Sequence, residues 1–194
     1  MAAAVVEVRA GEPVRQRSWL ADPGIRIPAQ ASAIHGISSE HATAGGHPAR
    51  DVADEVAQML TGYWTQGVPV VALTARLDRC PIGPVIDPYT IDRAVDRYRK
   101  GKRNLEAVCA EYGVRLDVAH DATADALAAV RVACAIATRH EAVAALTPAE
   151  LHERQIQWYA EWAEDFQRFL RGKGERDAVV DGAWPLREPA SVVG

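Results

Sequence analysis

Several residue types are scarce in this 194-residue chain, which has 2 Phe, 2 Met, 3 Cys, 3 Lys and a single Asn. No apolar run approaches the roughly 18 residues of a membrane-spanning helix, and residues 1–8 lack the basic start and the length of a signal peptide. The cysteines Cys80, Cys109 and Cys134 are odd in number and lack paired metal-ligand spacing. We therefore expect a cytoplasmic protein whose cysteines are reduced core residues.

An excess of positive charge is also missing, because the net charge is −4 and the isoelectric point is near 5.9. This balance excludes a protein that holds nucleic acid chiefly through a large basic surface. It leaves open an enzyme that grips a nucleic-acid end through metal ions. Alanine is abundant, with 36 residues in a sequence that is 48% hydrophobic. One domain with appendages and a core of small side chains is expected.

The N-terminal half is predicted to contain a hairpin and a helix. Residues 3–9 and a second run through Val14, Trp19 and Leu20 read as two strands, separated by the Gly and Pro of residues 11–13. A loop rich in Pro and Gly and a compact stretch around residues 31–37 follow. A helix should then open at Pro48. Its apolar residues recur at helical spacing and should face a sheet: Val52, Val56, Met59, Leu60 and Tyr63.

Two short apolar runs, residues 68–73 and 84–86, are predicted to be buried strands. A parallel pair of strands needs a crossover of about a dozen residues or more, usually with a helix. The connector at residues 74–83 is shorter and contains Pro81. Either these strands do not form an ordinary strand–helix–strand unit, or a helix is missing.

The C-terminal half is predicted to be helical. One helix is capped by Asn104 and stopped by Gly113, and the next begins near Asp121 or Thr123 and runs towards His140. A third starts after a Thr147 cap, and Trp184 in the tail is expected to dock on the body. The second of these helices should bury Leu127, Val130, Cys134 and Ala137.

Two residues at a predicted helix start could carry chemistry. His120 lies just before the helix and Asp125 lies one turn inside it. An imidazole can take a proton from water near neutral pH, and a carboxylate is a hard oxygen ligand for Mg²⁺ or Mn²⁺. On spacing alone, a capping role at the helix N-terminus explains the pair equally well.

A wider set of motifs resembles the DEDDh family of 3′ to 5′ exonucleases in order and spacing. The resemblance covers roughly residues 3–138, and within the family it is strongest to the proofreading epsilon subunits of bacterial DNA polymerase III. The motifs are Ile27-Pro28-x-x-Ala31-x-x-x-His35-Gly36-Ile37, Val85-Ile86-Asp87, Gly101-Lys-Arg-Asn-Leu105-Glu-Ala107 with Tyr112-Gly113, and His120-x-x-x-x-Asp125.

The resemblance implies a ribonuclease-H-like α/β fold, a mixed sheet flanked by helices. It also implies two divalent metals, Mg²⁺ or Mn²⁺, held by four carboxylates at a nucleic-acid 3′ end. Asp125 matches the last metal ligand and His120 the general base. Gln30, Ala31 and His35 match the loop around the terminal nucleotide. DNA is the expected substrate in preference to RNA, and a DNA polymerase subunit is an implied partner.

The sequence also departs from the family pattern. The first motif of the family, Asp-x-Glu, occurs nowhere, and Asn104, the only Asn, lies outside the second motif. Three of the four metal ligands therefore lack a counterpart, and we expect the first strand and one crossover helix to be absent and activity to be impaired. Asp87, Asp92 and Asp96 are the other carboxylates considered, and they are expected to be solvated or to cap helices.

These observations predict an incomplete nuclease domain at residues 1–146, an amphipathic helix at 147–171 and a tail at 172–194. The alternative is a non-catalytic binding or scaffolding module that uses the aromatic residues Trp158, Tyr159, Trp162 and Phe166 of that helix. The same residues would instead pack on the protein's own core if the helix is an ordinary amphipathic one. A third possibility is a chain that folds poorly because sheet edges are left unpaired.

Overall fold

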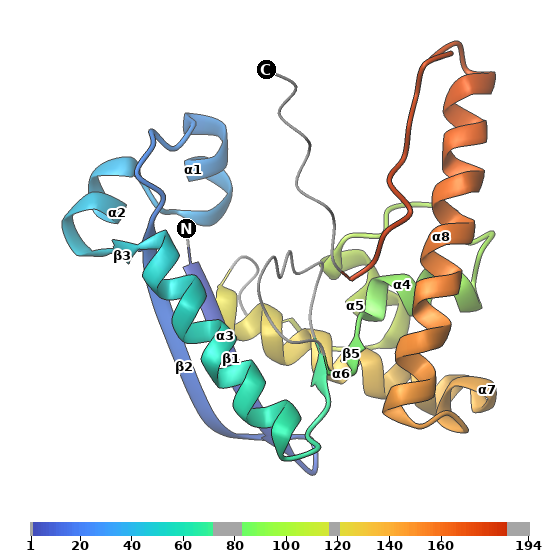
Figure 1. Cartoon of the computed structure of the whole chain (residues 1–194), viewed down its shortest axis with the longest axis horizontal. Helices are drawn as coiled ribbons and strands as arrows, with labels where there is room; N and C mark the ends of the chain where they lie inside the picture. The colour runs from blue at the N-terminus through green and yellow to red at the C-terminus, as the bar shows by residue number, and fades with distance from the viewer. Residues whose placement is uncertain (1, 72–82, 117–120, 186–194) are drawn as a thin grey trace.

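The computed structural model describes residues 2–71, 83–116 and 121–185, and shows strands and helices in a mixed α/β arrangement (Figure 1). No helix in these ranges is both long enough and apolar enough to cross a membrane. In chain order the elements are β1 (Ala2–Arg9), β2 (Glu12–Asp22), α1 (Ala29–His35), α2 (Ser39–Gly45), β3 (His47–Pro48), α3 (Ala49–Thr65), β4 (Val70–Val71), β5 (Val85–Ile86), α4 (Pro88–Val95), α5 (Leu105–Tyr112), α6 (Ala122–Arg139), α7 (Glu141–Ala144) and α8 (Pro148–Gly172).

The predicted hairpin is confirmed, with β1 and β2 antiparallel from the Ala2–Leu20 pair to the Arg9–Glu12 pair. Ala10 and Gly11 form the turn with φ of 50° and 85°, the left-handed conformation that tight hairpins require. The end of β2 pairs in parallel with β3. The predicted helix is confirmed as α3, which packs Val52 against Trp19 and other residues of the hairpin.

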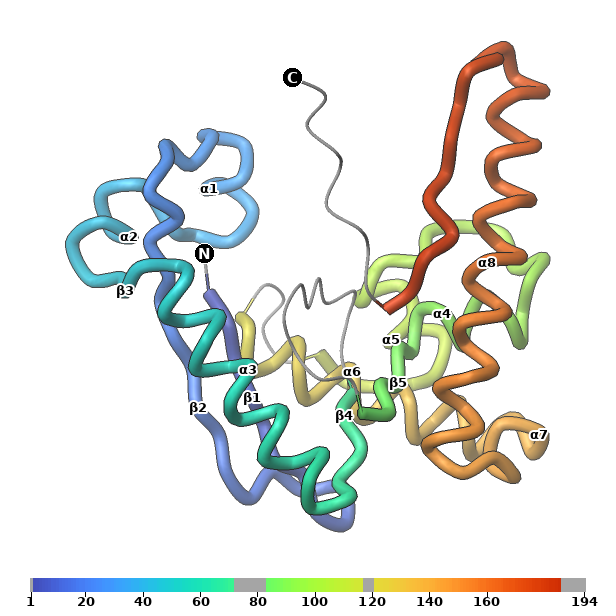
Figure 2. Tube along the Cα trace, viewed as in Figure 1, coloured from blue at the N-terminus to red at the C-terminus, as the bar shows by residue number. Residues whose placement is uncertain are grey.

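Of the two predicted buried strands, the second is confirmed as β5 and the first only at β4, which pairs with it in parallel through Val70–Val85 and Val71–Ile86. Val68, at the start of the first run, is exposed, and residues 72–73 lie outside the described residues. The centre of their connector, residues 72–82, lies outside the described residues. Among the described strands, β4 and β5 form one sheet, and β1, β2 and β3 form another. Helix α6 contacts strands of both sheets and so joins the two sheets (Figure 2).

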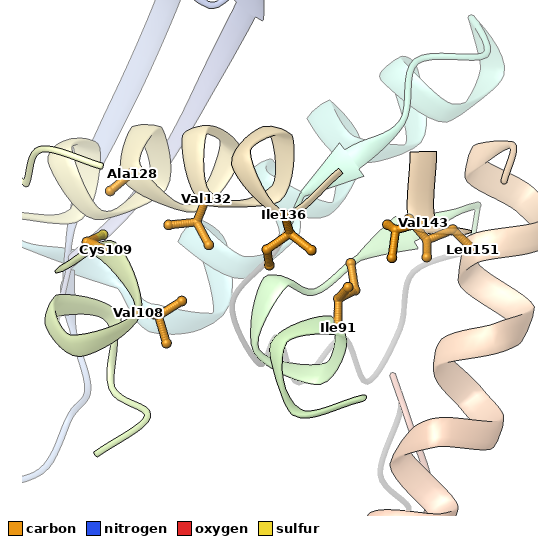
Figure 3. Close-up of a cluster of buried hydrophobic side chains, with 8 residues drawn as sticks. All are labelled: Ile91, Val108, Cys109, Ala128, Val132, Ile136, Val143 and Leu151. Atoms are coloured by element: carbon orange, nitrogen blue, oxygen red, sulfur yellow. The ribbon is translucent and has the colours of Figure 1, made fainter. Parts of the chain in front are cut away.

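The main core lies on the other side of α6. Ala128, Val132 and Ile136 point from α6 towards α4 and α5, where Ile91, Val108 and Cys109 meet them (Figure 3). The buried face predicted for α6 is wrong. Cys134 is exposed, and Leu127, Val130 and Ala137 are only half-buried. The reason is that α6 is covered on two sides, by the helices and by the hairpin, so its alanine-rich sequence has no single apolar face.

Local cap chemistry fixes the ends of the other helices as predicted. The Asn104 side chain accepts a hydrogen bond from Ala107 N at 3.1 Å, and Gly113 ends α5 in the left-handed conformation with φ 67°. Asp121 caps α6 through Ala124 N at 2.8 Å, and Thr147 forms a capping box with Glu150 at the start of α8.

Helix α8 and the chain that follows it close the body. Four residues at four-residue intervals on α8 are buried. After Gly172 the chain runs back beside α8, where Val180 N donates to Gln167 Oε1 at 3.0 Å, and Trp184 is buried as predicted. The α8 residues in this buried series are Leu151, Gln155, Tyr159 and Ala163.

Candidate functional site

Asp125 lies one turn inside α6, half-buried, and its N–H donates to the carbonyl oxygen of Asp121 at 2.8 Å. The Asp121 side chain caps the helix, so Asp125 is not needed for that task. Its carboxylate stands in the first turn, where the helix dipole favours negative charge. His120, the predicted partner of Asp125, lies outside the described residues.

Helices α4 and α5 bring Tyr89 and Cys109 near Asp125. Burial, followed by the charges of Asp87, Cys109 and Asp125, raises the pKa of Tyr89 to about 12. Burial, with a smaller contribution from Asp125, also raises the pKa of the Cys109 thiol. The Tyr89 hydroxyl is therefore harder to deprotonate than an ordinary tyrosine hydroxyl. Sequence reasoning missed this tyrosine, because the only signal was its place two residues after Asp87.

Asp87 is a cap, as predicted, but it is buried rather than solvated, with 1% exposure. Its carboxylate accepts hydrogen bonds from Tyr89 N at 2.8 Å, Thr90 Oγ1 at 3.1 Å and Trp184 Nε1 at 3.3 Å. Burial raises the pKa of Asp87 despite these bonds. With its oxygens occupied by protein donors, Asp87 serves as a structural carboxylate.

Gln155 of α8 fixes the chain that leads into Asp87. Its Oε1 accepts from Asp87 N at 2.7 Å, and its Nε2 donates to the carbonyl oxygen of Val85 at 3.0 Å. His152 Nδ1 lies 3.2 Å from Val85 N. Helix α8 therefore positions the end of β5, although it lies far along the chain. The sequence does not predict this, because Gln155 is simply a polar residue on an amphipathic helix.

The expectation that Asp92 is solvated or caps a helix is wrong. Asp92 lies within α4 with 0% exposure, and its Oδ2 is 2.6 Å from Arg99 Nη2 and 2.8 Å from Arg103 Nη1. Both arginines come from the loop after α4, and their side chains reach back to Asp92. Their positive charges offset the buried carboxylate. Asp96 ends α4 as its C-cap, with 46% of its side chain exposed.

The residues predicted to hold a terminal nucleotide lie on α1. Gln30 is exposed, and Ala31 and His35 are half-buried. His35 Nδ1 accepts a hydrogen bond from Ile37 N at 3.1 Å, and Gly36 ends the helix with φ 71°. Figure 1 shows α1 and α2 together at one end of the molecule, with α8 at the opposite end.

The described carboxylates do not fit a two-metal centre. Across residues 2–71, 83–116 and 121–185, no group of three His, Cys, Asp or Glu side chains gathers closely enough to hold an ion. Each Mg²⁺ or Mn²⁺ needs several oxygen ligands, and a single Asp125 cannot supply them for two ions. Asp125 is thus the one predicted metal ligand that the described chain places at this site.

Comparisons with known proteins agree with this architecture. A solved structure of "Exonuclease X in complex with 5′ overhanging duplex DNA" superposes with a TM-score of 0.58 and 21% identity, covering 78% of this chain and 88% of that one. A family profile of exonucleases, the RNase T type, matches residues 1–133. No curated protein sequence matches the chain.

The fold is therefore that of the ribonuclease-H-like α/β proteins, a mixed sheet flanked by helices. The family profile spans more than half of the sequence. The chain belongs to the exonuclease family, of the DEDDh type that its motifs resemble.

Proposed function

We propose that this protein acts at nucleic-acid 3′ ends as a DEDDh-type 3′ to 5′ exonuclease, on DNA in preference to RNA, and that its activity is impaired. The observation that carries the proposal is the family match over residues 1–133 together with Asp125 in the first turn of α6, five residues after His120. The free thiols of Cys109 and Cys134 suit a reducing compartment, so we place this activity in the cytoplasm.

In this proposal each matched residue has one role. His120 would take the proton from the attacking water, and Asp125 would contribute one carboxylate ligand to a divalent ion, Mg²⁺ or Mn²⁺, which when bound would supply charge stabilisation at the phosphodiester. Gln30, Ala31 and His35 pack around the terminal nucleotide. Hydrolysis would release a nucleoside 5′-monophosphate. The proposed impairment rests on the ligand count, because within residues 2–71, 83–116 and 121–185 no group of three His, Cys, Asp or Glu side chains gathers to hold the ions.

The test is hydrolysis of a labelled single-stranded DNA oligonucleotide with Mg²⁺ or Mn²⁺, beside an RNA of the same sequence. We expect slow release of mononucleotides from the 3′ end, and His120→Ala or Asp125→Ala to lower the rate by about 100-fold or more. Glu106→Ala, an exposed carboxylate in the first turn of α5, is the matched control and should leave the rate unchanged.

Two results would count against this proposal. Hydrolysis that persists in the His120 and Asp125 variants would remove their assigned roles. Fast hydrolysis that both variants abolish would keep the roles but overturn the impairment.

The alternative is a non-catalytic binding or scaffolding module with the family fold. What favours it is the lack of gathered metal ligands in the described part of the chain. It predicts that the wild-type protein binds the oligonucleotide without shortening it in either metal.

We also propose, from motif spacing alone, kinship with the proofreading epsilon subunits, which implies a polymerase subunit as partner. Co-purification of the tagged protein with the polymerase of its own cell would support this kinship. Elution as a lone chain would contradict it.

A further inference from the structure

The buried side of α8 continues past the body of the protein. Leu151, Gln155 and Tyr159 pack on the body, and at 3.6 residues per turn the aromatic side chains that follow fall on the same side of the helix. Figure 1 shows the C-terminal half of α8 rising beyond α4 and α5, beside the returning chain. We call Trp162, Phe166 and Phe169 the aromatic stripe.

The rings of the aromatic stripe lie nearly parallel and partly open to solvent. Trp162 and Phe166 have centroids 5.4 Å apart and planes 11° apart, and Phe166 and Phe169 follow at 6.3 Å and 14°. Phe166 is 39% exposed and Phe169 is 56% exposed. The returning chain bonds to Gln167 and Arg171, on a side of the helix away from Phe166 and Phe169, and the cluster that includes its Trp184 packs against Trp162.

Cations stand at both ends of the aromatic stripe, although the protein as a whole is acidic. The Arg93 guanidinium lies 4.3 Å from the centroid of Trp162, and the Lys173 ammonium lies 5.7 Å from that of Phe169. Asp165, beside the stripe, is already paired with Arg97 and with Arg168.

A pocket of about 210 Å³ between α4 and α8 adjoins the Trp162 end of the stripe. Its walls carry more positive than negative charge. The lining residues with side-chain charge or rings are Arg93, Arg97, Arg103, Trp158, Glu161, Trp162 and Asp165.

Arg93, the cation beside Trp162, lies on the same helix as Tyr89 of the candidate site. Arg93 follows Tyr89 by one turn of α4, which places the two side chains on one side of that helix. The charge of Asp125 raises the pKa of Tyr89 and the charge of Arg93 lowers it, both less than burial does.

We propose that the aromatic stripe, with Arg93 and Lys173, binds single-stranded nucleic acid, the bases stacking on the rings and the phosphates lying near the cations. This inference rests on the proposed function, since it places the strand that leads to a 3′ end at Asp125. Partly exposed aromatic rings beside cations are the means by which proteins bind single strands without sequence preference.

A second copy of this chain is the poorer occupant. A phenylalanine side chain offers on the order of 200 Å², so the exposed parts of the two rings sum to on the order of 200 Å² in each copy. A stable interface buries about 800 Å² on each partner.

The test is fluorescence anisotropy of a labelled oligothymidine of about 15 nucleotides, in EDTA so that no hydrolysis occurs. The variants are Phe166→Leu with Phe169→Leu, which keep apolar bulk, and Phe166→Tyr with Phe169→Tyr, which keep the rings. Stacking contributes about 1–3 kcal/mol per base, so we expect the leucine pair to weaken Kd by about tenfold or more and the tyrosine pair to stay within about twofold. Glu164→Ala, on another side of α8, is the matched control.

The outcomes separate the stripe from the catalytic proposal. Equal Kd for wild type and the leucine pair, or no binding by wild type, overturns the stripe whether or not the protein hydrolyses DNA. Ring-dependent binding supports it even if no hydrolysis occurs with Mg²⁺. A dimer in light scattering that the leucine pair loses would assign the stripe to a protein contact and overturn the inference.

Discussion

A single carboxylate organises the turn between α4 and α5. Asp92 is buried within α4, and two guanidinium groups from the following loop meet its Oδ2 at 2.6 and 2.8 Å. Desolvation costs each of these ions several kcal/mol, and their mutual attraction offsets that cost only while all partners are present. Asp92 therefore holds in place the loop that leads to Asn104.

Replacing Asp92 should therefore be severe. Asp92→Ala leaves Arg99 and Arg103, whose side chains are only 12% and 15% exposed, without their shared partner. We expect the free energy of unfolding, measured by urea denaturation, to fall by about 3–5 kcal/mol. Asp96→Ala on the same helix, at a position 46% exposed, should cost less than about 1 kcal/mol. Equal losses in the two variants would show that the buried pairing is unimportant.

Asp87 should make stability depend on pH in a defined direction. Burial raises the pKa of this carboxyl in the folded protein. Its contribution to stability is complete below the unfolded pKa of about 3.9 and is lost as pH rises through the folded pKa. Asp87→Asn does not titrate, so its melting temperature should gain on that of wild type between about pH 4 and pH 7. Thermal melts across that range check this, and a gain by wild type instead would contradict it.

At the scale of helices and strands, the sequence predicts those features that depend on neighbouring residues. Caps at Asn104 and Thr147 and the stop at Gly113 were predictable because each depends on residues within one turn. The hairpin and α3 were predictable from periodicity. For the candidate site, the sequence motifs predict His120 and Asp125, and of these the described residues include Asp125, in the first turn of α6.

What could not be predicted depends on packing between distant segments. The buried face of α6 was misassigned because that helix is covered on two sides, which removes the contrast that periodicity needs. Asp92 and Gln155 are buried polar residues whose partners come from other parts of the chain, Arg103 and Val85 among them. Burial of such groups is set by those partners, and single-residue preferences place them on the surface.

At the scale of the whole molecule, α8 belongs to the core that supports the site. Gln155 holds the end of β5, Tyr159 packs on Val85, and Trp184 in the returning chain donates to Asp87. We propose a division into an incomplete nuclease domain at residues 1–146, an amphipathic helix at 147–171 and a tail at 172–194. We expect the first segment to need the second in order to fold, because residues 1–146 alone would leave polar and apolar groups of β5 and α4 uncovered.

Two truncations test how the segments depend on one another. A chain that ends at residue 172 keeps α8 and loses Trp184, so we expect a cooperative thermal transition at a lower temperature than in the full chain. A chain that ends at residue 146 also loses Leu151, Gln155 and Tyr159, which exposes Val85 and the buried start of α4. It should show no cooperative transition by circular dichroism. A sharp melt of the chain that ends at residue 146 would establish residues 1–146 as an independent folding unit. A broad melt of the full chain would instead show that unpaired sheet edges limit folding.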